Sequence, residues 1–213
     1  MTADTKNAKD TKDRLIEAAT TVLKAHGYGG TSARTIAKEA GVNSALVFYH
    51  FGGVDQLLLA ALDRSSAERM AQHSATVAEV RTLEELAEAA TRIYRDDLDD
   101  GHITLFSELV AAAVAKPELR EEVSKRVEPW LEFIESTLER VIGGTPLARL
   151  TPPRDLANAA ITFYLGVNLF TVLDADRSRT ESVFAMVKRL APRAKLLTMR
   201  LPGRRNGARR ATE

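Results

Sequence analysis

Two short apolar segments separated by one glycine constrain the fold of this chain more than any other feature. Residues 31–51 read TSARTIAKEAGVNSALVFYHF, and Gly41 interrupts the helical pattern between the two segments. Gly41 supplies a turn conformation that is costly for other residues, and the small Ala37 lets two helices cross closely. The second segment spans about two turns, which is too short for a stable isolated helix. The pattern therefore predicts a helix-turn-helix packed on a neighbouring helix.

Both short helices have residues suited to capping and an apolar side suited to packing. Thr31 or Ser32 can cap the first helix, and Asn43 or Ser44 can cap the second. The apolar side of the motif consists of Ile36, Ala40, Val42, Val47 and Phe51.

Helical periodicity continues through most of the remaining chain. A first helix is expected from Thr11 until Gly27 ends it, and a long helix is expected to begin near Val54. Gly143, Gly144 and Pro146 predict a loop. Further helices are expected at about 83–100, 102–115, 117–142, 153–175 and 180–199. No strand pattern and no internal repeat interrupts them, so the predicted class is all-α.

Composition removes several classes of protein. Hydrophobic residues make up 45% of the 213 residues, enough for a sizeable core, and the absence of cysteine excludes disulfides, thiol catalysis and cysteine-ligated zinc. The net charge is only +1, but basic side chains gather near both ends, at Lys6, Lys9, Lys12, Arg200, Arg204, Arg205, Arg209 and Arg210. They are typical of solvated tails or of nonspecific phosphate contacts. Without a signal segment or about 18 successive apolar residues, a cytoplasmic protein with no membrane partner is expected.

Residues 11–71 resemble the tetracycline-repressor (TetR) family. The resemblance rests on His26-Gly27-Tyr28, Thr31-Ser32, Ile36-Ala37, Ala40-Gly41-Val42 and Phe48-Tyr49-His50-Phe51. It implies about nine helices, a homodimer, a three-helix DNA-binding head and a larger helical bundle that binds a ligand.

The resemblance also implies a division of the chain and a set of partners. We expect a disordered polar tail at 1–10, a DNA-binding domain at 11–71, an effector-binding and dimerisation domain at 72–200, and a disordered arginine-rich tail at 201–213. The partners would be double-stranded operator DNA and a small, mostly apolar effector. The expected function is a repressor that the effector releases from its operator. An activator, an effector-independent regulator and a helical protein-binding adaptor are the alternatives.

A recognition helix presents its exposed side chains to base edges and phosphates in the major groove. Tyr49 and His50 can donate to phosphates, Arg34 can bind guanine or phosphate, and Phe48 can contact a thymine methyl or belong to the core. The resemblance places Ser32 and Ala33 near the DNA backbone. The predicted DNA-binding residues are Ser32, Ala33, Arg34, Asn43, Ser44, Ala45, Phe48, Tyr49 and His50.

Three positions depart from the family pattern in ways that remove phosphate contacts. The family usually has tyrosine where Phe48 stands, often threonine where Leu46 stands, and usually lysine where Val54 stands. We therefore expect DNA binding to depend less steeply on salt than in relatives with the full set.

The later helices supply candidates for an effector pocket and a dimer interface. Pockets in helical bundles are largely apolar with a few polar groups, and the candidates of this kind are Tyr94, His102, Phe106, Glu108, Trp130, Phe133 and Tyr164. The helix at 153–175 is apolar on most faces, so it needs a second partner, in the family the other subunit, unless a monomer buries it. The predicted interface residues are Phe163, Val167, Phe170, Val183, Val187 and Leu190.

No pattern of catalytic or metal-binding residues accompanies these features. The four histidines lack metal-ligand spacing, and the glycines at 27–30 lie between helices rather than after a strand. The acidic run at 96–100 is typical of a solvated helix end rather than of a metal site. We therefore expect no enzyme activity, no metal and no cofactor.

Overall fold

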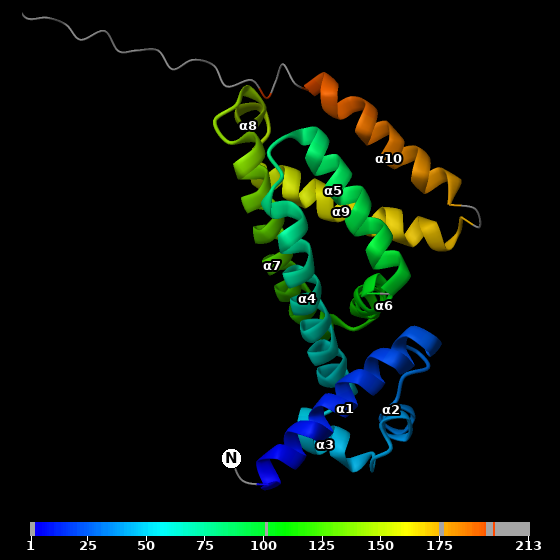
Figure 1. Cartoon of the computed structure of the whole chain (residues 1–213). Coiled ribbons are helices and arrows are strands. Elements are labelled where there is room, and N and C mark those ends of the chain that lie inside the picture. Colours follow the sequence, from blue (N-terminus) through cyan, green and yellow to red (C-terminus); the bar gives the residue numbers. More distant parts are fainter. Residues whose placement is uncertain (1–2, 101, 175–176, 195–197, 199–213) are drawn as a thin grey trace, which may run out of the picture.

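The structure, a computed structural model, describes residues 3–100, 102–174, 177–194 and 198, and these residues form helices without any strand (Figure 1). The elements in the described ranges are α1 (Ala3–His26), α2 (Ala33–Ala40), α3 (Ala45–Phe51), α4 (Val54–Ala78), α5 (Leu83–Asp100), α6 (His102–Ala115), α7 (Pro117–Ile142), α8 (Pro146–Leu150), α9 (Pro153–Val172), α10 (Ser178–Leu190) and a 3₁₀ turn η1 (Ala191–Ala194). The predicted all-α class is confirmed.

Helices α1, α2 and α3 form one end of the molecule, which we call the head (Figure 1). Gly41 ends α2 in the left-handed conformation, with φ of 65°, so the expected glycine turn is present. The chain then enters α3, and α4 leads from the head into the remaining helices. Helices α5 to α10 are called the body, and α4 belongs to both parts.

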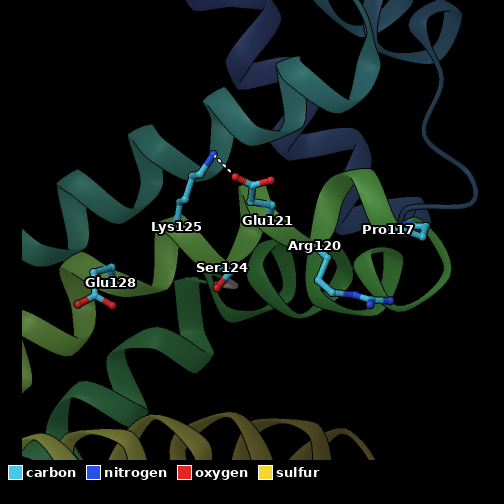
Figure 2. Close-up of a pocket in the computed structure, with 6 residues that line it drawn as sticks. All are labelled: Pro117, Arg120, Glu121, Ser124, Lys125 and Glu128. Atoms are coloured by element: carbon cyan, nitrogen blue, oxygen red, sulfur yellow. Dashed lines mark ion pairs between the residues drawn. The ribbon is translucent and has the colours of Figure 1, made fainter.

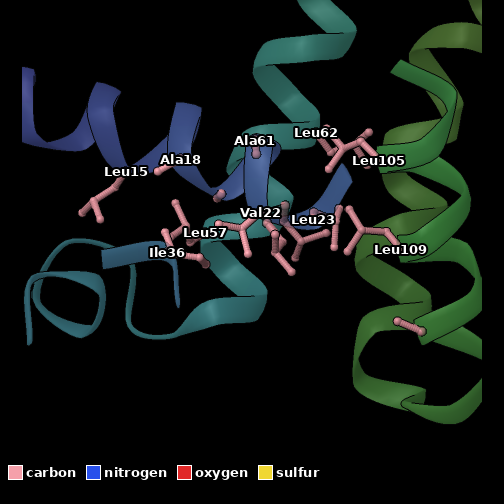
Figure 3. Packing of buried hydrophobic residues seen from close by; sticks show 14 of the residues in the cluster. Leu15, Ala18, Val22, Leu23, Ile36, Leu57, Ala61, Leu62, Leu105 and Leu109 are labelled. Atoms are coloured by element: carbon pink, nitrogen blue, oxygen red, sulfur yellow. The ribbon is translucent and has the colours of Figure 1, made fainter. Parts of the chain in front are cut away.

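One continuous apolar core joins the head to the body (Figure 3). Leu15, Ile36 and Leu57 fill the space between α1, α2 and α4, and each is fully buried. The same cluster continues into α6 through Leu105 and Leu109. The head is therefore packed directly on the body and is not attached only through a linker.

The body has smaller, separate apolar clusters. One lies where α4, α5 and α7 meet and includes Val77 and Ile142. Another, with Leu131 and Leu138, lies between α7 and α9. A third brings α5, α9 and α10 together. These helices enclose a cavity that is described below.

The first helix begins earlier than predicted, at Ala3 instead of Thr11. The side chains described between Ala8 and Asp10 are exposed, so no apolar period could reveal these turns. Among the described residues no single helix is long and apolar enough to cross a membrane; α3 and α4 meet that test only as a pair, bent by 63°. The predicted tail at 201–213 and the arginines from Arg200 onward lie outside the described residues.

Two later predictions also differ from the structure. The residues predicted as a loop contain the short helix α8, where Thr145 accepts a hydrogen bond from the backbone N–H of Ala148. The described chain thus has ten α-helices. The last of them ends at Leu190 instead of Met199, because Pro192 has no backbone N–H to continue it.

Candidate DNA interface and enclosed cavity

Helix α3 shows a strong contrast between its two sides. Val47 is completely buried, whereas Phe48 is 58% exposed and Tyr49 is 81% exposed. Ser44 and Ala45 are also exposed. Phe48 is thus excluded from the core, which was one of its two expected roles. A short helix held by one apolar side presents an open surface with two aromatic rings.

Two of the predicted DNA-binding residues also cap the short helices. The Ser32 hydroxyl accepts a hydrogen bond from the Thr35 N–H, and the Thr35 hydroxyl oxygen accepts one from the Ser32 N–H. Asn43 Oδ1 accepts from the Ala45 N–H at 2.8 Å. Ser44, the other candidate cap, makes no such bond. These caps fix the starting points of both helices of the motif.

The other predicted residues lie around this surface. Arg34 is exposed on α2, and Ala33 is half-buried beside it. His50 is half-buried, with its ring edge-on to Tyr49 at a centroid distance of 4.9 Å. Arg14 on α1 donates to the Ala40 carbonyl at 2.5 Å and so holds the end of α2. Helix α1 thus holds the inner side of the motif, and the outer side of α3 remains exposed.

A polar cluster at the contact between head and body was not predicted. The Tyr28 N–H donates to Glu108 Oε2 at 2.7 Å, which ties the turn after α1 to α6. The Tyr28 hydroxyl donates to Asp55 at the start of α4, and Lys116 donates to the Tyr28 oxygen at 2.7 Å and to Asp55 Oδ2 at 3.0 Å. We call Tyr28, Asp55, Glu108 and Lys116 the junction cluster.

Electrostatics and backbone geometry both fit this cluster. Burial, supported by the hydrogen bond to Asp55, raises the pKa of Tyr28, so the phenol stays protonated. Hydrogen bonds to Tyr28 and Asp55 raise the pKa of Lys116. Gly27 has a φ of 64°, and a Cβ there would lie 3.1 Å from Glu108 Oε2. Glu108, predicted to line an effector pocket, instead contacts the base of the head and is absent from the lining of the cavity described below.

A partly open cavity of about 260 Å³ lies in the body; Phe163, at its edge, is exposed. We call it the enclosed cavity because it is the less open of the two hollows described here. Its lining is mostly aliphatic and aromatic, and helices α4 to α7, α9 and α10 all contribute. The aromatic side chains of the lining are Phe106, Trp130, Phe133, Phe163, Tyr164 and Phe184. Four predicted effector residues are thus brought together at this cavity, with Phe163 added from the predicted dimer interface.

Two other predicted effector residues lie elsewhere or are not described. Tyr94 is buried outside the lining, where its ring packs on Phe184 at 4.6 Å and its hydroxyl shares a hydrogen bond with Thr171 at 2.7 Å. His102 begins α6, and its side chain lies outside the described residues.

Charged groups are buried at one part of the cavity wall. Asp97 is only 3% exposed, so the expected solvated position is wrong for this residue of the acidic run, whereas Asp96 is exposed as expected. Asp97 Oδ1 lies 3.3 Å from Arg69 Nη1 and 3.2 Å from His73 Nε2, and Asp97 Oδ2 accepts a hydrogen bond from the Tyr164 hydroxyl. Burial, reinforced by the charge of Asp97, raises the pKa of Tyr164, which keeps its proton. These four residues form the buried charged cluster.

The sequence contains a signal for this cluster. Asp97 follows Ala90, Ile93 and Tyr94 at helical spacing, so it continues the inward face of α5. Arg69 and His73 are four residues apart on α4 and therefore share one face of that helix. Asp97 therefore differs from Asp96 beside it, which is exposed.

A second hollow lies along the solvent side of α7 (Figure 2). Polar and charged side chains line most of it, including Arg120, Glu121 and Lys125, and Lys125 pairs with Glu121 at 2.9 Å. This depression is shallow and open to solvent. The enclosed cavity fits an apolar ligand better because it can remove the ligand from water.

An exposed apolar face lies on α9 and α10. The α9–α10 face consists of Leu169, Phe170, Leu173, Met186 and Leu190, all well exposed. Of the predicted interface residues, Phe170 and Leu190 belong to it, and Val183 and Val187 are half-buried. Phe163 is 37% exposed. Val167 instead packs within its own subunit against Tyr94 and Phe184.

Residues 15–61 match the family model described as bacterial regulatory proteins, tetR family. The transcriptional regulator CymR of Pseudomonas putida is 29% identical over 180 residues, which cover 83% of this chain and 86% of CymR. The probable transcriptional regulator YttP of Bacillus subtilis is 46% identical over 48 residues, covering 22% of this chain and 23% of YttP.

Solved structures agree in fold. A TetR-family member from Streptomyces coelicolor has a TM-score of 0.61 at 29% identity and covers 85% of this chain and 98% of its own. The multidrug binding protein EbrR, complexed with imidazole, has a TM-score of 0.60 at 27% identity, covering 84% and 89%. A TetR-family regulator from Cytophaga hutchinsonii has a TM-score of 0.72 at 17% identity, covering 87% and 95%.

The family model covers the helix-turn-helix, and the solved relatives extend the likeness over the body. The exposed side of α3, the glycine turn after α2 and the helical body agree with that assignment. The chain belongs to the TetR family of DNA-binding, helix-turn-helix transcriptional regulators.

Proposed function

We propose that this regulator is a homodimeric repressor that a small apolar effector releases from double-stranded operator DNA. The observation that carries the proposal is the position of α6. Phe106 on α6 lines the enclosed cavity, and Glu108, on the same helix, binds the Tyr28 N–H at the base of the head. A ligand that moves α6 would therefore act on the head directly.

The exposed side of α3 is proposed to enter the major groove. Tyr49 and His50 would donate to phosphates, and Phe48 would make apolar contact with a thymine methyl. Arg34, exposed on α2, would bind guanine or phosphate. Ser32, Ala33, Asn43, Ser44 and Ala45 would bring the starts of both helices close to the DNA backbone.

The α9–α10 face is proposed to bind the same face of a second subunit. Five large apolar side chains are exposed on α9, at its C-cap and on the adjacent α10, and burying them suits a twofold interface. With a twofold axis along the length of the molecule, such pairing would place two α3 helices on one side of the dimer. Two half-sites about 34 Å apart could then be bound together.

Release would follow if the effector binds better to a dimer whose two heads have the wrong spacing. A coupling free energy of about 1–3 kcal/mol changes operator affinity roughly 5–150-fold. The junction cluster could transmit a change in the body to the head. Glu108 and Lys116 belong to the body, and they contact Tyr28 and Asp55 near the head.

A mobility shift with DNA from upstream of the regulator's own gene tests the DNA interface. Tyr49→Ala should weaken binding about ten-fold or more, since hydrogen bonds to charged groups contribute about 1.5–3 kcal/mol. Leu150→Ala on α8 is the matched control, because Leu150 is similarly exposed but lies at the opposite end of the molecule (Figure 1). Equal losses in both variants would contradict the interface.

Salt dependence and oligomeric state complete the test. Because Phe48, Leu46 and Val54 replace phosphate-binding residues, the slope of log K against log salt should be shallow. A slope equivalent to about twelve released ions, at about 0.9 per phosphate, would oppose this. Sedimentation should give a dimer that Phe170→Glu dissociates, and a monomeric parent chain would overturn the proposed interface.

A further inference from the structure

The size of the enclosed cavity constrains the part of a ligand that it can surround. Its volume is about 260 Å³. An apolar cavity of about 150 Å³ holds one benzene molecule. By proportion, the cavity accommodates a compound of about ten non-hydrogen atoms, which is one aromatic ring with a short substituent.

The walls favour an aromatic ring over a flexible chain. Trp130 and Phe133 lie edge to face, with centroids 6.2 Å apart and planes at 90°. Phe163 and Phe184 are arranged similarly, at 5.9 Å and 78°. The cavity wall therefore offers both ring faces and ring edges to a ligand. An aromatic ligand ring can pack against them in the offset or perpendicular arrangements that aromatic rings prefer.

One part of the wall offers a hydrogen-bond acceptor. Tyr164, Asp97 and His73 all line the cavity. The Tyr164 hydroxyl donates its hydrogen bond to Asp97 Oδ2, so the lone pairs of the Tyr164 oxygen can accept a hydrogen bond from a ligand. Donation to a carboxylate polarises that oxygen and makes it a better acceptor. A ligand group that donates a hydrogen bond is therefore favoured there.

The charges at this wall favour an uncharged ligand. Asp97 lies 3.3 Å from the Arg69 guanidinium, and both side chains are buried. A ligand carboxylate would meet the lone pairs of Tyr164 and Asp97, while an ammonium would compete with Arg69 for Asp97. Either ion would lose its hydration without gaining an uncompensated opposite charge.

We propose that the effector is an uncharged single-ring aromatic compound with one hydroxyl group, which donates a hydrogen bond to the Tyr164 oxygen. The proposal rests on the proposed effector site and adds the chemical class of its ligand. The ring lies among Trp130, Phe133 and Phe163, and the hydroxyl extends the hydrogen-bonded chain to Tyr164 and then to Asp97.

Calorimetric titration of the full chain with four matched probes tests this ligand class. The probes are 4-propylphenol, propylbenzene, 4-propylbenzoate and 4-propylbenzylamine. The phenol should bind about ten-fold or more tightly than each of the others, since it alone donates without carrying a charge. Trp130, the only tryptophan of the chain, provides an independent fluorescence readout. Equal or tighter binding of any other probe, or no binding of the phenol, overturns the proposal.

Two tyrosine variants test the assigned acceptor. Tyr164→Phe keeps the ring but removes the oxygen, so affinities for the phenol and propylbenzene should converge to within about threefold. Tyr94→Phe is the control, because Tyr94 is a buried, hydrogen-bonded tyrosine outside the cavity lining. An unchanged preference for the phenol in Tyr164→Phe would overturn the role of Tyr164.

A mobility shift with bound operator separates this proposal from the proposed function. If the phenol binds but does not release DNA, the ligand class stands and effector release fails. If the phenol does not bind while a charged or larger compound releases DNA, the ligand class fails and the repressor mechanism stands.

Discussion

The head and the body of this regulator differ in how completely their apolar side chains fill the interior. In the head, Leu57, Leu58, Leu59 and Leu62 on α4 are all completely buried in one continuous core. The body divides its apolar side chains among smaller clusters, leaves a cavity of about 260 Å³ and buries Asp97. A densely packed head can leave α3 open for contact, whereas a loosely filled body can accept a ligand.

The largest expected effect concerns the buried charged cluster. Asp97→Ala should lower the free energy of unfolding by about 3–5 kcal/mol, because it leaves the buried Arg69 guanidinium without this carboxylate. Urea titration measures the loss. Asp63→Ala is the control, since the Asp63 pair with Arg126 lies nearer the surface and should contribute less than about 1 kcal/mol. Similar small losses in both would mean that the cluster adds little to the body.

Matched leucine truncations compare the two cores directly. Leu62→Ala should cost about 4 kcal/mol and Leu138→Ala about 2 kcal/mol, because Leu62 is fully enclosed whereas Leu138 already borders the cavity. Both values come from chemical denaturation. If Leu138 proved the more costly truncation, the contrast in packing would be wrong.

Enlarging an alanine should have opposite effects in the two regions. Ala61→Leu would overfill the head core and cost about 1–3 kcal/mol. Ala160→Leu would project into the cavity and raise stability by about 0.5–2 kcal/mol. It should also abolish binding of 4-propylphenol in calorimetry. Strong destabilisation by Ala160→Leu would show that the cavity has no room for added atoms.

The smallest effect tests the caps of the helix-turn-helix. Ser32→Ala removes the side-chain cap of α2 and should cost about 1 kcal/mol. Ser44 precedes α3 but its side chain makes no capping hydrogen bond. The free energy of unfolding of Ser44→Ala should therefore stay within about 0.5 kcal/mol of the parent value. Thermal unfolding distinguishes the two. Equal effects would mean that the Ser32 bonds do not stabilise the head.

The features that sequence could predict are those set by local spacing. Gly41 and the apolar residues around it predicted the helix-turn-helix, because both depend on residues within one or two turns. The large side chains at Phe106, Trp130, Phe133 and Tyr164 lie on inward helix faces, which the apolar pattern indicates. Their convergence on one cavity became visible only in the fold.

The missed features depend on contacts between distant segments. Tyr28 and Glu108 are 80 residues apart, so no local pattern could place that carboxylate beneath the head. Asp97 was misassigned because a charged residue is usually exposed, and its pairing with Arg69 depends on how α4 and α5 meet. Helix α8 was missed because glycine and proline surround it, although Pro146 is compatible with a first helical turn.

The length of α4, which runs from the head into the body, has a mechanical consequence. Since α4 has 25 residues and begins against α3, it forms a rod about 37 Å long, at about 1.5 Å per residue. A tilt of about 5° at its far end displaces the near end by about 3 Å. Such a rod would convert a slight rearrangement among the helices around the cavity into a displacement of the head by a large fraction of one base-pair step.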